Sequence, residues 1–194
     1  MRRLFLVIFV IFLVLMPSVM PRAATPALNL YEVEVIVFSN QLPDMEGGEL
    51  WRFEQIRPEN GDIAEAVVLG EQPPAESLLS PAALALEQSG RHHVLAHLRW
   101  QQNAEVKSSS KPVKISNPAE SLDGALRLYS SRYLLMDINL TLREPARTGF
   151  FGVSGGDTQI YRLSEFRRIK LLETHYFDHP KFGVLVRVAP VKEN

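Results

Sequence analysis

The chain has 194 residues, with 21 basic and 22 acidic side chains and no cysteine. This balance argues against a nucleic-acid partner, because proteins bind nucleic acids through strongly basic surfaces. Without cysteine the chain forms no disulfide and carries no lipoprotein lipid anchor, so in an exported protein the hydrophobic core alone would provide stability.

Residues 1–24 predict an export signal. Arg2 and Arg3 precede an apolar run, residues 4–16, and Ala23 and Ala24 follow it. This order is typical of a secretory signal, and the run is shorter than an ordinary membrane span. Arg22 stands where cleavage after Ala24 prefers a small residue, so an uncleaved N-terminal anchor is the alternative. Cleavage would remove three arginines and leave 18 basic against 22 acidic residues, a net charge of −4.

Residues 28–194 are long enough for one domain with an adequate core. Tyr31–Ser39 alternates valines with Glu32 and Glu34, which predicts a strand that is half buried at first and more buried toward its end. Asn40–Leu79 is rich in Pro, Gly, Glu and Gln and has no periodicity. It is therefore expected to be a long irregular segment.

One short helix is expected near residues 81–89. Ser80 can cap the free N–H groups, Pro81 suits the first turn, and Gly90 provides a stop. A second strand should follow. Its pattern puts Val94, Ala96, Leu98 and Trp100 on one face and His93, Leu95, His97 and Arg99 on the other. A short third strand is expected at Pro112–Ser116.

Residues 118–131 fit two structures. Leu122, Ala125, Leu126 and Tyr129 have helical spacing, but Gly124 would cost a helix about 1 kcal/mol. Leu126 and Leu128 with Ser130–Ser131 favour the first arm of a hairpin, and its second arm, residues 134–143, alternates clearly. Beyond a Gly-rich loop at Pro145–Asp157, strands are expected at Gln159–Leu172 and Val184–Val188. The chain is thus predicted to be mainly β (α+β), an antiparallel sheet of about six or seven strands with one short helix.

The segment THYFDHPKFG, residues 174–183, contains the most chemically suggestive residues. His175 and His179 would share one side of an extended chain, but zinc requires three or four ligands. No cysteine exists and no serine has a nucleophile-elbow context, so a histidine here has nothing to activate. A turn is the favoured interpretation: Asp178 would bond to nearby backbone, Pro180 would fix a dihedral angle, and Gly183 would adopt a conformation that other residues avoid. We therefore predict no catalytic residue, no metal and no cofactor.

Basic and aromatic residues alternate just before this segment, from Tyr161 to Lys170. Such a mixture suits a polymer of sugars and peptides, because rings pack on sugar faces and guanidinium groups pair with carboxylates. An ordinary solvated strand face is the alternative.

Four blocks together resemble the CsiV-type peptidoglycan-binding proteins of the gammaproteobacterial periplasm. They are YEVEVIVF (31–38), VLAHLRWQQ (94–102), LDGALRLYSSRYL (122–134) and FRRIKLLETHYFDHPKFGVLVRVAP (166–190). Leu135 departs from the family, in which a histidine is expected two residues after the motif tyrosine.

The resemblance implies a non-enzymatic periplasmic protein. It would bind peptidoglycan and support a class A penicillin-binding protein together with the outer-membrane lipoprotein LpoA. The motif positions of this chain become candidate ligand-binding residues: Trp100, Arg132, Tyr133, Arg167, Arg168, His175, Tyr176, Asp178 and His179, with Gly183 beside them. A secreted peptidoglycan hydrolase and an adaptor that binds only proteins stay open as alternatives.

Overall fold

The computed structural model describes residues 30–41, 66–69, 77–145 and 158–191. The predicted export signal (1–24), most of the irregular segment 40–79 and nearly all of the loop 145–157 lie outside these residues. The described elements are β1 (Leu30–Asn40), β2 (Val67–Val68), α3 (Ser80–Gln88), β3 (His92–Asn103), β4 (Val113–Asn117), a 3-10 turn (Pro118–Glu120), β5 (Leu122–Ser130), β6 (Leu134–Pro145), β7 (Thr158–Arg168), β8 (Thr174–His179) and β9 (Phe182–Pro190).

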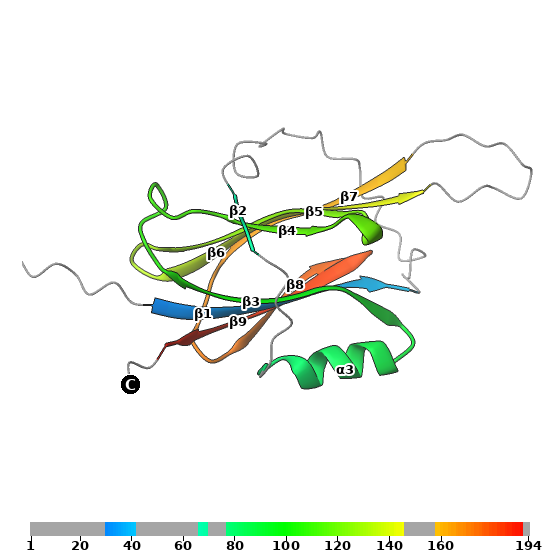
Figure 1. The fold of residues 1–194 in the computed structure, drawn as a ribbon, viewed down its shortest axis with the longest axis horizontal. Coiled ribbons are helices and arrows are strands. Elements are labelled where there is room, and N and C mark those ends of the chain that lie inside the picture. The colour runs from blue at the N-terminus through cyan, green and yellow to red at the C-terminus, as the bar shows by residue number, and fades with distance from the viewer. Residues whose placement is uncertain (1–29, 42–65, 70–76, 146–157, 192–194) are drawn as a thin grey trace, which may run out of the picture.

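The strands form two sheets, not the single sheet that was predicted. One sheet has four strands in the order β3-β1-β9-β8, and the other has five in the order β2-β4-β5-β6-β7. All described pairs are antiparallel except the two-residue pair of β2 with β4. Figure 1 shows the five-stranded sheet stacked on the four-stranded sheet, with α3 against the opposite face of the latter. The expectation of a mainly β fold with one helix is confirmed.

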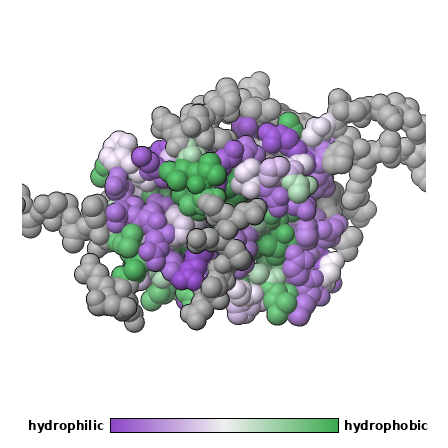
Figure 2. All heavy atoms as spheres, viewed as in Figure 1, coloured by the Kyte–Doolittle hydropathy of each residue, from purple (hydrophilic) through white to green (hydrophobic). Residues whose placement is uncertain are grey.

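Apolar side chains from the facing sides of both sheets make the main core. Those from the four-stranded sheet include Val33, Val35, Val184 and Val186, and those from the other sheet include Leu126, Leu128, Met136, Ile138 and Leu140. A smaller cluster lies under α3, where Ile36 and Phe38 of β1 meet Leu79 and the half-buried Leu86. The central strand β1 is therefore buried on both faces. Where Figure 2 shows the outer surface, hydrophobic residues form small groups separated by hydrophilic ones.

The second predicted strand is interrupted by a bulge. Val37 pairs with Ala96 and Phe38 pairs with Val94, so Leu95 is an extra residue in β3. Leu95 consequently points into the main core while Val94 packs toward α3, the reverse of the faces expected from simple alternation.

Residues 118–131 form a hairpin arm, as favoured, after one 3-10 turn. Glycine is required at position 124 of β5 because the backbone of β6 lies very close to it. A Cβ atom built on it would lie 2.2 Å from the Asn139 carbonyl oxygen of β6, so only glycine permits this close approach.

The last predicted strands have different limits. β7 ends at Arg168 rather than Leu172, and a turn at residues 170–173 leads into β8. Most of THYFDHPKFG is strand, and only Pro180 and Lys181 form the turn of the β8–β9 hairpin.

Candidate functional site

The two histidines of the β8–β9 hairpin both accept hydrogen bonds from backbone N–H groups. The Lys170 N–H donates to His175 Nε2 at 3.0 Å, and the Lys181 N–H donates to His179 Nδ1 at 3.1 Å. Burial, aided by the nearby Lys181 charge, lowers the pKa of His179 even though Asp178 opposes the shift. In the described part of the chain, no group of three potential metal-ligating side chains is present.

Tyr176 and Asp178 lie on the opposite face of β8 from the histidines. The Tyr176 hydroxyl donates to Asp178 Oδ1 at 2.5 Å, so the partner of Asp178 is a side chain and the predicted bond to backbone is wrong. Burial and this carboxylate raise the pKa of Tyr176 above its usual range. Gly183 has no left-handed dihedral angle either; it is needed because the Phe38 and Tyr176 rings lie over it.

Arg167 and Arg168 point to opposite faces of β7, as neighbours in a strand must. The Arg167 guanidinium lies 4.6 Å from the centre of the buried Phe177 ring and donates to the Tyr176 carbonyl at 2.8 Å. It also pairs with Glu165. Arg167 thus joins β7 to β8, the edge strands of the two sheets, which is a structural role.

Arg168 instead belongs to an exposed cluster on the outer face of the five-stranded sheet. Its guanidinium carbon lies 3.9 Å from the centre of the Tyr133 ring, and that of Arg132 lies 5.7 Å from the same centre. Phe166, two residues before Arg168 on the same face of β7, is 70% exposed. We call these four residues, Arg132, Tyr133, Phe166 and Arg168, the basic aromatic patch.

The outer sheet face that carries this patch is basic as a whole. Leu135, the position that departs from the family, pairs with Arg168 on one side and with Tyr129 on the other. Strand alternation places more cations than anions on this outer face: the basic residues are Lys114, Arg127, Arg143, Arg162 and Arg168, and the acidic ones are Asp123 and Asp137. A chain with a slight overall negative charge therefore carries one cationic face.

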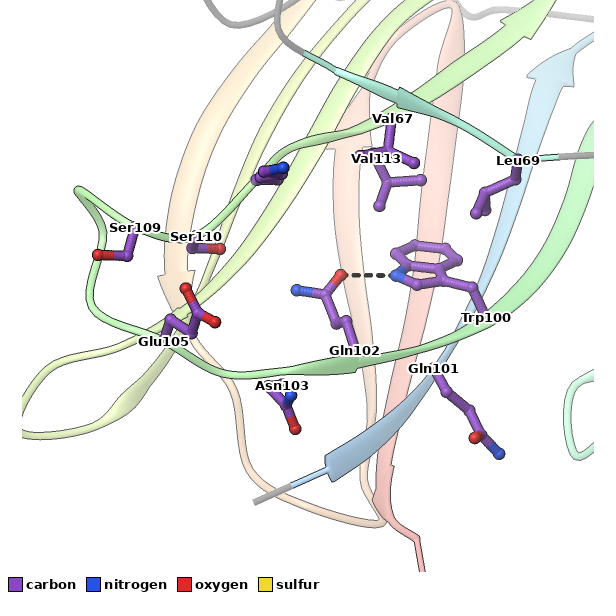
Figure 3. A pocket seen from close by; sticks show the side chains of 11 residues that line it. Val67, Leu69, Trp100, Gln101, Gln102, Asn103, Glu105, Ser109, Ser110 and Val113 are labelled. Atoms are coloured by element: carbon purple, nitrogen blue, oxygen red, sulfur yellow. Dashed lines mark hydrogen bonds between the residues drawn. The ribbon is translucent and has the colours of Figure 1, made fainter. Parts of the chain in front are cut away.

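Trp100 lies far from the patch, in a cavity of about 250 Å³ between the edges of β3 and β4. Its indole N–H donates to Gln102 Oε1 at 2.6 Å, and Gln102 Nε2 donates to the Leu128 carbonyl at 3.1 Å. Figure 3 shows the ring beneath Val67, Leu69 and Val113. The indole is nearly buried, and its contacts are those of a core residue at the rim of the sandwich.

A serine, a histidine and a carboxylate meet beside α3, but not as a catalytic triad. Ser77 Oγ and Glu34 Oε1 lie 3.2 and 2.7 Å from the same His97 nitrogen, Nε2, and the serine also bonds to Glu34. A triad requires the carboxylate on the other ring nitrogen. Glu34 also accepts the backbone N–H groups of Leu78 and Leu79, at 3.0 Å and 3.2 Å, so the group holds this segment to the sheet.

The structure thus brings together Arg132, Tyr133 and Arg168, and places Trp100 and the residues of the β8–β9 hairpin elsewhere. Phe166 belonged to the alternation of basic and aromatic residues noted in the sequence but was not among the candidate ligand-binding residues, although its position two residues before Arg168 in a predicted strand was a usable signal. Among the described residues, no helix has the length and hydropathy to cross a membrane.

The family described as "Peptidoglycan-binding protein, CsiV" matches residues 5–191, nearly the whole chain. No curated protein and no solved structure matches it. The chain belongs to the CsiV family of peptidoglycan-binding proteins.

Proposed function

We propose that this protein is a periplasmic, non-enzymatic accessory protein that binds peptidoglycan through the basic aromatic patch. The observation that carries the proposal is the pair of guanidinium groups whose carbons lie 3.9 Å and 5.7 Å from the centre of the exposed Tyr133 ring, with the exposed Phe166 two residues before Arg168 on the same face of β7. Planar guanidinium groups pair with carboxylates such as those of the wall peptides, and aromatic rings pack on the apolar faces of sugars. Membership of a peptidoglycan-binding family and the cationic outer face support the same role.

By binding peptidoglycan, the protein would be held where new peptidoglycan is synthesised and would assist that synthesis. The family resemblance supports a partnership with an LpoA-type outer-membrane lipoprotein and, through it, with a class A penicillin-binding protein. The N-terminal sequence, Arg2 and Arg3 followed by an apolar run, supports export to the periplasm.

The test is retention on purified sacculi of the parent chain and its Arg168→Glu, Arg168→Lys and Tyr133→Ala variants. Arg168→Glu should abolish most retention, and Arg168→Lys should lose part of it because lysine keeps the charge without the planar fork. Arg143→Glu, a matched change at the other end of the same sheet face, should have little effect. Equal losses for Arg143→Glu and Arg168→Glu would show that only net charge matters, and normal retention of Arg168→Glu would exclude the patch.

The same samples test the two alternatives. A protein-only adaptor would not sediment with sacculi in any form. A hydrolase would release soluble muropeptides from them.

A further inference from the structure

Segments that are distant in sequence meet at one end of the sandwich. The Val191 N–H donates to the Leu30 carbonyl at 3.0 Å, and the Leu172 N–H donates to the Val188 carbonyl at 2.8 Å. The start of β1, the end of β9 and the turn between β7 and β8 therefore lie together, at the left of Figure 1. We call residues 170–173, Lys-Leu-Leu-Glu, the leucine turn.

The leucine turn holds apolar side chains in a position that the fold does not require. Leu171 and Leu172 are both exposed, Leu172 by 57%. The φ angle of Leu172 is 64°, in the left-handed region that side chains with a Cβ atom disfavour. Glycine or asparagine would hold this backbone with less strain and would expose no apolar surface. A contact outside the domain explains the leucine better than any contact within it.

The surroundings of the turn combine apolar and cationic side chains. Leu30 and Val106 are exposed at the same end, and Val106 follows Glu105, whose carbonyl accepts the Ser130 N–H at 2.7 Å. Arg132, Arg168 and Lys170 are exposed nearby. The one anion of the turn, Glu173, lies 3.5 Å from Lys170. Exposed apolar residues beside cations are typical of surfaces that bind anionic lipid bilayers.

The predicted export signal would limit the distance of this same end from a bilayer. The apolar run of residues 4–16 connects to Leu30 through residues 17–29, which span at most about 45 Å when extended. While that run is in a membrane, whether during export or as an anchor, the start of β1 stays within about 45 Å of the lipid.

We propose that the leucine turn docks on an anionic lipid surface, with Leu171 and Leu172 entering the acyl region and Lys170 at the headgroups. Wall peptides and glycans are polar and would leave the two leucines uncovered, whereas a bilayer offers partners to both the leucines and the cations. Phe166, on the outer sheet face away from the turn, would stay accessible to the wall.

The experiment uses the full chain, in which the absence of native cysteine permits a single attached fluorophore. An environment-sensitive dye is placed at Leu171→Cys, or at Ser89→Cys as the control, an exposed position beyond α3 at the opposite end of β3. Each chain is mixed with phosphatidylcholine vesicles or with vesicles that also contain phosphatidylglycerol. We expect the dye at position 171 to shift to the blue and to be quenched by brominated acyl chains, more strongly with phosphatidylglycerol. The dye at position 89 should stay in water.

Adding Leu172→Asn and Lys170→Glu to the chain labelled at position 171 should reduce the shift at least several-fold. A dye at position 171 that remains in water on both vesicles overturns the proposal, even if the chain is tethered by its N-terminus. Equal responses on neutral and anionic vesicles would contradict the role of the basic side chains in the proposal. A response to sacculi or to a purified partner protein, with none to vesicles, would assign the turn to that partner instead.

Discussion

The rings of Phe38 and Tyr176 stack across Gly183, with their centres 6.1 Å apart and their planes inclined by 14°. The three residues come from β1, β8 and β9, the adjacent strands of one sheet. A Cβ atom on Gly183 would lie 2.6 Å from Phe38 and 2.7 Å from Tyr176. The glycine of the family motif therefore makes room for an aromatic pair.

Gly183→Ala should destabilise the domain by about 1–3 kcal/mol, because at least one ring must leave its position. Chemical denaturation of the variant measures the loss. Removing one of the two rings should restore part of the stability, so Gly183→Ala combined with Tyr176→Ala should cost less than the sum of the single changes. Strict additivity of the two changes would contradict the packing explanation.

Glu34 should be the most important carboxylate for stability. It is only 3% exposed and accepts the N–H groups of Leu78 and Leu79 while contacting His97. Glu34→Ala leaves these donors without an acceptor in a buried site, which should cost about 3 kcal/mol or more. Glu34→Gln, which keeps one acceptor oxygen, should cost less.

Hydrogen exchange of the α3 amides gives the second measurement, because loss of this anchor should release α3 before the sheets unfold. Glu32→Ala is the control, since Glu32 pairs with Arg99 in a more exposed ion pair. If the Glu32 and Glu34 variants lose the same stability, the anchoring role of Glu34 is refuted.

The sequence predicted the strands and the helix more accurately than the long-range contacts between them. Alternation identified β1 and β6, and Ser80, Pro81 and Gly90 identified α3. The same alternation wrongly placed Glu34 on an exposed face. Its burial depends on backbone groups more than forty residues away, at Leu78 and Leu79, and no local pattern reveals such a contact. The predicted cap at Ser80 failed for the same reason: the helix has no side-chain cap, and Glu34 binds the residues before it.

The candidate ligand-binding residues do not form one site, because successive side chains of a strand point to opposite faces of the sheet. Neighbouring motif residues such as Arg167 and Arg168 point to opposite faces, so a dense motif supplies side chains to several places. Arg168 meets Tyr133 because β6 pairs with β7 in a register that sets Leu135 opposite Arg168. That register, and the division into two sheets, arise from contacts that a single sequence does not display.

His93 should make stability depend on pH. Its ring lies between two carboxylates, with Nδ1 3.2 Å from Glu87 Oε1 and Nε2 3.5 Å from Glu120 Oε1. Burial is the largest single influence and lowers the pKa of His93, but the two carboxylates together raise it above its usual value. The stabilisation is therefore complete below the unfolded pKa of about 6.5 and is lost as the pH rises through the higher folded pKa.

The measurement is the difference in melting temperature between the parent chain and His93→Gln, from about pH 5 to pH 8.5, the range in which histidine titrates. The difference should be largest at the acidic end and should shrink as pH or salt rises, because these side chains are well exposed and screened. A difference that grows with pH would show that the carboxylates do not control this histidine.

Leu172→Asn should stabilise the domain while removing an apolar side chain. Asparagine tolerates the left-handed backbone of residue 172, and the exposed leucine has little burial to lose, so a gain of about 0.5–1 kcal/mol is expected. For a domain of this size that gain corresponds to a rise of about 1–4 °C in melting temperature. Leu171→Asn is the matched control, because the same change is made at an exposed neighbour without a positive φ angle, and it should give no gain. If Leu172→Asn instead destabilises the domain, the leucine contributes to the fold itself and its strain is offset within the protein.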